Sequence, residues 1–245
     1  MARSMIRFTV ASLALLAVGG MSQTAVAGPT WPEDPPDAGS LPGTAQIPFP
    51  LGGGPLTMIS GRLSGPTPTP GLRGPGDFED MYLIQVTDPL LFFASTDPAD
   101  GGFADFNTEL FLFTGPDHPD GPGLGMFAND DNPGALNNES RITGSVTDGS
   151  ITPAFLPGLH YYLAVTGFVD TPTSGGLSIF DQALPTEISG PDGPGGFGVI
   201  DGWSKPGEFG DYQIVLEGVS FPKPSPGAGA LFVFGAVFGA SRRRR

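Results

Sequence analysis

The 245 residues include 39 glycines, 28 prolines and no cysteine, with 25 acidic residues against 11 basic ones. The lack of cysteine excludes a disulfide framework, a thiolate zinc site and a cysteine nucleophile. Two basic residues lie in the first 27 positions and four end the chain, and neither group has an acid beside it. Five basic residues therefore face 25 acids in the body, an excess of 20. Such a surface repels phosphates, so we predict no binding to nucleic acid.

The first 27 residues have the pattern of a secretory signal peptide. Arg3 and Arg7 give a positive start and residues 8–18 are mostly apolar. Ala25 and Ala27 then supply the small-x-small pattern at which signal peptidase cuts. The apolar run is too short to favour a permanent membrane span. We predict export with removal of residues 1–27, and an uncleaved anchor is the alternative.

The next part of the chain predicts an extended lead-in followed by a β domain. Residues 28–55 are dense in proline and glycine, which favours an extended chain. From 56 to 218, short β-branched and aromatic runs alternate with Gly-Pro turns, and side chains follow a period of two. No window outside the termini shows helical periodicity free of Gly and Pro. The predicted fold is all-β, a single antiparallel β-sandwich. The runs of strand length are 56–63, 81–86, 90–95, 109–113, 141–146, 161–167 and 211–217.

Residues 170–210 are too long for an ordinary loop in a compact domain. We predict a structured insertion held to the domain by large apolar residues, because such residues are seldom left in water. These residues are Phe180, Phe197, Ile200 and Trp203. The alternative is a mobile flap whose apolar side chains touch a partner.

A series of motifs runs through residues 56–218. It starts with the acidic turn Asp77-Phe78-Glu79-Asp80, which leads into an aromatic strand, and continues with segments 106–113, 127–132, 140–142, 157–165 and 210–216. In this order the motifs resemble the bacterial pre-peptidase C-terminal domain, although Asn107 stands where that family usually has Asp. The resemblance implies a jelly-roll-like β-sandwich, often an appendage of secreted peptidases. Because the chain has no catalytic domain, peptidase activity is not implied.

Residues 219–245 combine a Pro-rich motif at 221–226, an apolar run at 227–240 and a terminal arginine cluster. The combination resembles the PEP-CTERM sorting signal, with Lys223 where the usual motif has Glu. As a helix the apolar run would span ~21 Å, less than the ~30 Å hydrocarbon core. We predict transient anchoring until a sorting transpeptidase cuts near the Pro motif. A plain C-terminal membrane tail is the alternative. The sorting residues are Pro222, Lys223, Pro224, Arg242, Arg243, Arg244 and Arg245.

No enzyme motif is present in the sequence. His118 and His160 have no metal-binding spacing, and there is no Gly-x-Ser-x-Gly string or phosphate-binding loop. We expect His118 to be an exposed turn residue and His160 to pack at a strand start. We therefore predict no enzyme activity. A hydrolase with an unrecognised carboxylate pair is an alternative.

Two acidic turns could bind calcium, because hard oxygen ligands suit that ion. The competing interpretation is that Asp and Asn side chains cap their own backbone. The candidate ligands are Asp77 and Asp80 in the first turn, with Glu79 beside them, and Asn129, Asp130 and Asp131 in the second, with Asn132 beside them.

Together these patterns predict an exported, non-enzymatic protein of the cell surface or extracellular matrix with a structural or adhesive role. Its expected partners are signal peptidase, the sorting transpeptidase, and extracellular polysaccharide or surface proteins. Membrane contact is expected through the tail alone. The alternative is a calcium- or glycan-binding accessory module. Trp203, Tyr161 and Tyr162 could stack on sugars, but we expect the two tyrosines to fill the core.

Overall fold

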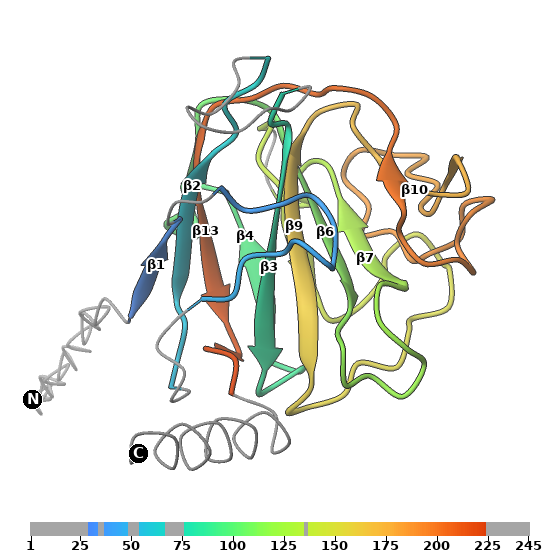
Figure 1. The fold of residues 1–245 in the computed structure, drawn as a ribbon, viewed down its shortest axis with the longest axis horizontal. Coiled ribbons are helices and arrows are strands. Elements are labelled where there is room, and N and C mark those ends of the chain that lie inside the picture. The colour runs from blue at the N-terminus through green and yellow to red at the C-terminus, as the bar shows by residue number, and fades with distance from the viewer. Residues whose placement is uncertain (1–28, 34–36, 49–53, 67–75, 135–136, 224–245) are drawn as a thin grey trace, which may run out of the picture.

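The computed structural model describes residues 29–33, 37–48, 54–66, 76–134 and 137–223 (Figure 1). These residues form an all-β, sandwich-like fold, as the period-two pattern predicts. None of them belongs to a helix that is long and apolar enough to cross a membrane. The predicted signal peptide with Ala25 and Ala27, the apolar run 227–240 and the terminal arginines lie outside the described residues.

Two larger sheets face each other, and all their strand pairs in the described part of the chain are antiparallel except β1–β2. The first sheet has the order β1 (Thr30–Pro32), β2 (Met58–Arg62), β13 (Asp211–Glu217), β4 (Phe93–Ser95) and β8 (Arg141–Thr143), with β5 (Phe103–Ala104) paired to β13. The second has the order β14 (Val219–Ser220), β3 (Glu79–Val86), β9 (His160–Gly167), β6 (Thr108–Thr114) and β7 (Gly125–Asn129).

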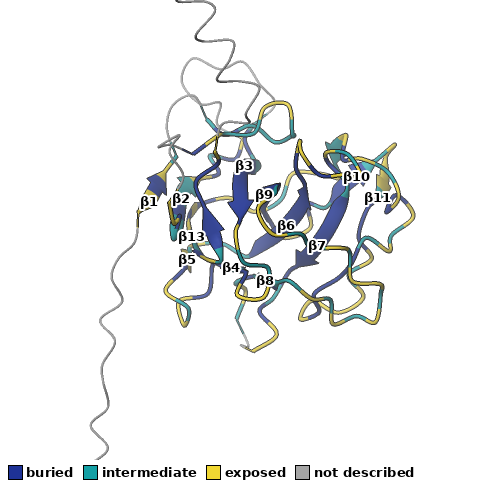
Figure 2. Cartoon of the chain, turned by 90° about the horizontal axis from the view of Figure 1, so that it is seen from below, coloured by how far each residue is buried: buried dark blue, intermediate teal, exposed yellow. Residues whose placement is uncertain are grey.

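The alternation of side chains gives the second sheet two buried faces. In β3, Tyr82 and Ile84 point into the core between the sheets, where they join Ile214 of β13. Met81 and Leu83 point the other way, into a second apolar cluster. Figure 2 shows β3, β6, β7 and β9 as buried strands. Burial on both faces explains their nearly continuous apolar sequences.

A third, small sheet lies in the insertion and covers the outer face of the second sheet. It consists of β10 (Pro172–Ser174), β11 (Leu177–Ser178) and β12 (Gly202–Trp203). Phe180 and Ile200 are buried in the second cluster. The Trp203 ring lies 5.6 Å from the Phe111 ring, and its Nε1–H donates to the Ser40 carbonyl at 2.9 Å. The predicted anchoring of the insertion is confirmed for these three residues. It is wrong for Phe197, which is fully exposed at the tip of a glycine-rich turn.

The Pro-rich lead-in is built into both sheets. β1 extends the first sheet along β2. Figure 1 shows the following segment, in blue, crossing the second sheet. There Leu41 and Ala45 pack on the second cluster, and Gln46 accepts a hydrogen bond from Leu83 N–H at 2.9 Å. Residues 29–33 therefore lie at the edge of one sheet, and residues 37–48 run onto the outer face of the other.

Candidate cation site

Three carboxylates converge where the lead-in leaves the edge of the first sheet for the outer face of the second. Glu33, Asp37 and Asp80 each place an oxygen within 4.8 Å of the others. Asp80 lies at the start of β3, Glu33 follows β1 directly, and Asp37 lies in the lead-in. The pairing of β1 with β2 carries Glu33 to this point, and the Glu33 N–H continues the ladder by donating to the Ser60 carbonyl at 2.7 Å.

Backbone groups hold the Glu33 carboxylate from two sides. Its Oε1 accepts the Ala38 N–H at 2.9 Å and its Oε2 accepts the Arg62 N–H at 3.1 Å. Gly61 makes the close approach possible, because a Cβ at this position would overlap both the Tyr212 hydroxyl and the Glu33 carboxylate. The glycine thus lets the first sheet present a carboxylate to the second.

Asp80 is fully buried, and only one of its two carboxylate oxygens has a hydrogen-bond partner among the described residues. Its Oδ2 accepts a hydrogen bond of 2.5 Å from the Tyr212 hydroxyl, which in turn lies 2.5 Å from the Tyr82 hydroxyl. Its Oδ1 is buried and has no hydrogen-bond partner among the described residues. A buried polar atom without a partner costs ~1–3 kcal/mol. The orphaned oxygen belongs to the carboxylate that gathers with Glu33 and Asp37.

Two members of the cluster, Asp80 and Asp37, have raised pKa values. Burial raises the pKa of Asp80 well above its usual range, and the charges of Glu33 and Asp77 add to the effect. Burial raises the pKa of Asp37 from 3.8 to about 7, together with a hydrogen bond and the charge of Glu33. Among the described residues no basic side chain forms an ion pair with these carboxylates, since Arg62 pairs with Asp211 instead. The cluster must therefore retain protons or bind a cation.

The donor set fits a hard divalent cation. All three side chains offer carboxylate oxygens, which Ca²⁺ and Mg²⁺ prefer to nitrogen or sulfur ligands. Ca²⁺ takes about 6–8 oxygens, so water would supply the rest. A divalent charge would remove the repulsion between the carboxylates, and one bound at Asp80 Oδ1 would also give that oxygen a partner.

The two acidic turns that were alternative candidates for a calcium site lie apart in the structure. Asp80 lies opposite Val165, Val165 opposite Leu110, and Leu110 opposite Asn129, so β9 and β6 separate them. Of the first turn, Asp80 belongs to the cluster. Asp77 lies nearby, and its Oδ2 accepts the Ser64 N–H at 2.6 Å.

In the second turn, Asn129 serves the backbone. Its Nδ2 donates to the carbonyls of Asp131 and Glu187 at 2.7 and 2.8 Å, and its Oδ1 accepts the Arg141 N–H at 2.7 Å. These bonds occupy both polar atoms of the amide. For Asn129 the competing interpretation, a side chain that hydrogen-bonds to nearby backbone groups, is therefore confirmed.

Asp130 lies near a different buried acid, Glu109. Burial raises the pKa of Glu109 to about 8, with the Asp130 charge as the next cause, and burial and Asp131 raise the pKa of Asp130 to about 7. Glu109 Oε1 accepts the Val169 N–H at 2.8 Å. In the described part of the chain, three metal-binding side chains place ligand atoms within 4.8 Å of one another only at Glu33, Asp37 and Asp80. The acids around Glu109 therefore do not form a second three-carboxylate cluster of this kind.

Glu33 and Asp37 are not among the ligands predicted from the sequence. They lie in a proline-rich stretch far from Asp80, and only the pairing of β1 with β2 brings them to it. The acidic residues within the otherwise apolar and proline-rich lead-in were the one available signal.

The structure corrects the expectation for one histidine. His118 was predicted to be exposed but is buried, with its ring 5.8 Å from the Tyr161 ring. The predicted packing role of His160 is confirmed: it is buried, and its Nδ1 lies 2.7 Å from Asp117 Oδ2. Tyr161 and Tyr162 are core residues, as predicted, so neither offers a face to a sugar.

Comparison of the chain with protein-family models, curated proteins and solved structures finds no match. The site is therefore interpreted from its own geometry.

Proposed function

We propose that the chain is an exported, non-enzymatic structural protein of the cell surface or extracellular matrix, and that a divalent cation, Ca²⁺ first, fastens its N-terminal segment to the sandwich. The observations that carry the cation site are the convergence of the Glu33, Asp37 and Asp80 carboxylates and the buried Asp80 Oδ1 that has no hydrogen-bond partner among the described residues.

The position of the cluster supports a structural role. Glu33 is attached to the edge of the first sheet, Asp80 belongs to the second, and Asp37 lies in the segment that crosses between them. A bound cation would therefore add a link between three parts of the chain that are otherwise joined by the β1–β2 pairing and by the apolar packing of Trp31, Leu41 and Ala45. In the wet, calcium-containing space outside a cell, such a link would replace the disulfides that this chain lacks.

Export rests on the sequence. The signal peptide with its Ala25 and Ala27 cleavage pattern, and the tail that resembles PEP-CTERM, support delivery to the surface with transient anchoring. The jelly-roll-like arrangement implied by the resemblance to the pre-peptidase C-terminal domain belongs to the same proposal.

Calorimetric titration of the purified full chain with CaCl₂ and with MgCl₂ tests the cation site. The expected result is one saturable site for at least one of the ions, lost in Asp80→Asn and kept in Asp88→Asn. Asp88 lies just beyond the other end of β3, and its carboxylate caps the Leu90 N–H at 3.0 Å, a bond that asparagine can keep. Absence of heat in the wild type, or equal binding by Asp80→Asn, would refute the proposal.

Export is tested separately by the intact mass of protein recovered from cells. A mass that begins at Gly28 and ends near Pro224 supports processing at both ends. A full-length mass would contradict it without bearing on the cation site.

A further inference from the structure

The last described residues lie at the end of the sandwich where β3 ends. There β14 pairs with β3, and the Gly218 carbonyl accepts the N–H groups of Thr87 and Asp88 at 2.8 and 3.1 Å. Lys223 is the last residue of the described part of the chain. Figure 1 shows these final residues, in red, at the lower end of the molecule beside the end of β3. The chain therefore leaves the sandwich at this end.

The sequence limits how far this end can stand from a membrane. The apolar run 227–240, the proposed anchor, begins four residues after Lys223. A fully extended chain covers at most ~3.3–3.6 Å per residue, so these four steps span at most ~14 Å. While the tail is anchored, Lys223 is therefore held close to the surface of the bilayer.

The turn that follows β3 presents two leucines at the same end. Leu90 is 96% exposed and Leu91 is 56% exposed. The Asp88 carboxylate accepts the Leu90 N–H at 3.0 Å, and the Asp88 carbonyl accepts the Leu91 N–H at 3.2 Å. Because Gly218 also binds this turn, the two leucines are fixed beside the strand that leads to the exit.

The apolar surface continues from the two leucines. Together with Pro89 and Phe93 they line a hollow of about 350 Å³. Arg141 also lines it, but its Nε pairs with Asp100 Oδ2 at 3.2 Å and its guanidinium lies 5.1 Å from the centre of the Phe93 ring. The one cationic group is thus already paired, and the surface offers mainly hydrocarbon to a partner.

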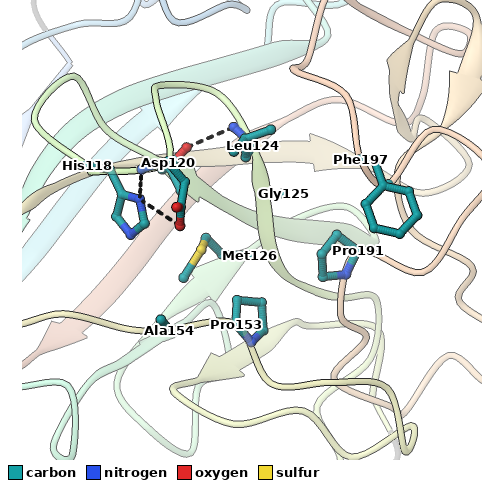
Figure 3. A pocket seen from close by; sticks show the side chains of 11 residues that line it. His118, Asp120, Leu124, Gly125, Met126, Pro153, Ala154, Pro191 and Phe197 are labelled. Atoms are coloured by element: carbon teal, nitrogen blue, oxygen red, sulfur yellow. Dashed lines mark hydrogen bonds and ion pairs between the residues drawn. The ribbon is translucent and has the colours of Figure 1, made fainter.

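Exposure alone does not distinguish this face. Phe197 is fully exposed and borders a different hollow, beside Met126, Pro153 and Pro191 (Figure 3). That hollow lies next to β7, which supplies Met126, and β7 and β14 are opposite edges of the second sheet. Phe197 therefore lies across the sheet from the place where the chain leaves.

We propose that the turn 88–91 contacts the bilayer in which the tail is anchored, with Leu90 and Leu91 entering the boundary between headgroups and acyl chains. This inference rests on the proposed anchoring of the tail and adds a second contact to it. Two contacts would fix the orientation of the sandwich and hold the Pro motif 221–226 at the membrane surface. A zwitterionic lipid suits the contact, because the acidic body would be repelled by anionic lipid.

Fluorescence of single-cysteine variants tests the contact, because the natural chain has no cysteine to compete for the label. Leu90→Cys is labelled with the polarity-sensitive dye NBD in residues 28–245, which keep every described residue and the tail. The protein is reconstituted into phosphatidylcholine vesicles, with and without nitroxide-labelled lipid, and recovered by flotation.

Leu184→Cys is the matched control, since Leu184 is also an exposed leucine. The next residue, Pro185, accepts the Asp131 N–H at 2.8 Å, just beyond Asn129 at the end of β7. Asn129 lies in the same cross-strand row as Asp80, at the start of β3. The control therefore reports on the opposite end of the second sheet.

The label at position 90 is expected to shift its emission to shorter wavelength and to be quenched by the nitroxide lipid, and the label at position 184 to do neither. Two results overturn the inference: protein that floats with the vesicles while the label at position 90 emits as it does in water, or an equal response of both labels. Protein that does not float would contradict the anchoring of the tail and this inference with it. None of these results bears on the Glu33–Asp37–Asp80 site.

Discussion

The variant Asp80→Asn distinguishes two effects on the free energy of unfolding: the destabilisation caused by the carboxylate cluster without an ion, and the stabilisation provided by a bound cation. Without the ion, asparagine removes a buried charge and can donate a hydrogen bond from the position of the orphaned Oδ1. The gain at pH 8 is expected to be about 1–3 kcal/mol. For a domain of this size 1 kcal/mol shifts the melting temperature by ~2–4 °C, so the variant should melt about 2–12 °C above the wild type.

Saturating Ca²⁺ offsets this difference, because it stabilises the wild type alone. At a free concentration of 100 times Kd, an ion that binds only the folded protein adds about 2.7 kcal/mol, which corresponds to ~5–11 °C for the wild type. Asp80→Asn should not respond, because it lacks one of the three charged ligands. Differential scanning calorimetry at pH 8, with EDTA or with CaCl₂, measures both shifts.

The pH dependence of the same experiment has a defined sign. Folded Asp37 keeps its proton up to about pH 7, whereas the unfolded chain releases it near its ordinary value of 3.8. The folded state therefore binds more protons between these pH values, and the ion-free protein should lose stability as pH rises from about 4 to 7. Two results would refute this reasoning. One is a wild-type melting temperature that does not change with Ca²⁺ at pH 8. The other is a Ca²⁺-induced rise in melting temperature that is as large in Asp80→Asn as in the wild type.

Three further predictions concern the buried groups around the second sheet. Glu109→Gln should stabilise the protein at pH 9 by at most about 5 kcal/mol and leave its stability unchanged at pH 4, because the pKa of folded Glu109 is raised from 4.5 to about 8. Urea unfolding at both pH values measures the change in stability, and Glu217→Gln, at an exposed position, is the control. Trp203→Ala should speed amide hydrogen exchange in residues 170–210 more than in β9, because it removes the contact with Phe111 and the hydrogen bond to Ser40. An equal increase in exchange rate in both segments would contradict the anchoring role of Trp203. Phe127→Ala, in the core between the sheets, should cost about 3–5 kcal/mol in urea unfolding, and a loss below about 1 kcal/mol would contradict its placement there.

The sequence predicted the strands that carry most of the core. The alternation of Tyr212, Ile214 and Leu216 marks β13, and the apolar run 161–167 marks β9 almost to the residue. Prediction failed where local chemistry shortens a strand. The run 90–95 becomes a strand only at Phe93, because the Asp88 carboxylate caps the Leu90 N–H and the chain turns before it.

Other elements have no local signal at all. β1 is three residues long and ends at Pro32, so its sequence shows only an extended chain, and it becomes a strand because the edge of β2 is available. Long-range pairing of this kind also assembles the cation site. Asp80 could be selected from its acidic turn, but Glu33 and Asp37 could not.

The prediction for His118 failed for a related reason. The composition Asp-His-Pro-Asp predicts a turn, and a turn is present, with Gly121 N–H donating to the His118 carbonyl at 3.0 Å. Turn composition does not specify where the side chain points. Here the ring packs against Tyr161 in the interior.

The most direct test of the cation site is anomalous diffraction from crystals of the protein soaked in TbCl₃, since Tb³⁺ substitutes for Ca²⁺ at oxygen sites. We predict one strong anomalous peak ~2.3–2.6 Å from carboxylate oxygens of Glu33, Asp37 and Asp80. A well-ordered cluster without a peak, in crystals that bind the ion elsewhere or not at all, would contradict the claim that these three carboxylates form a cation site.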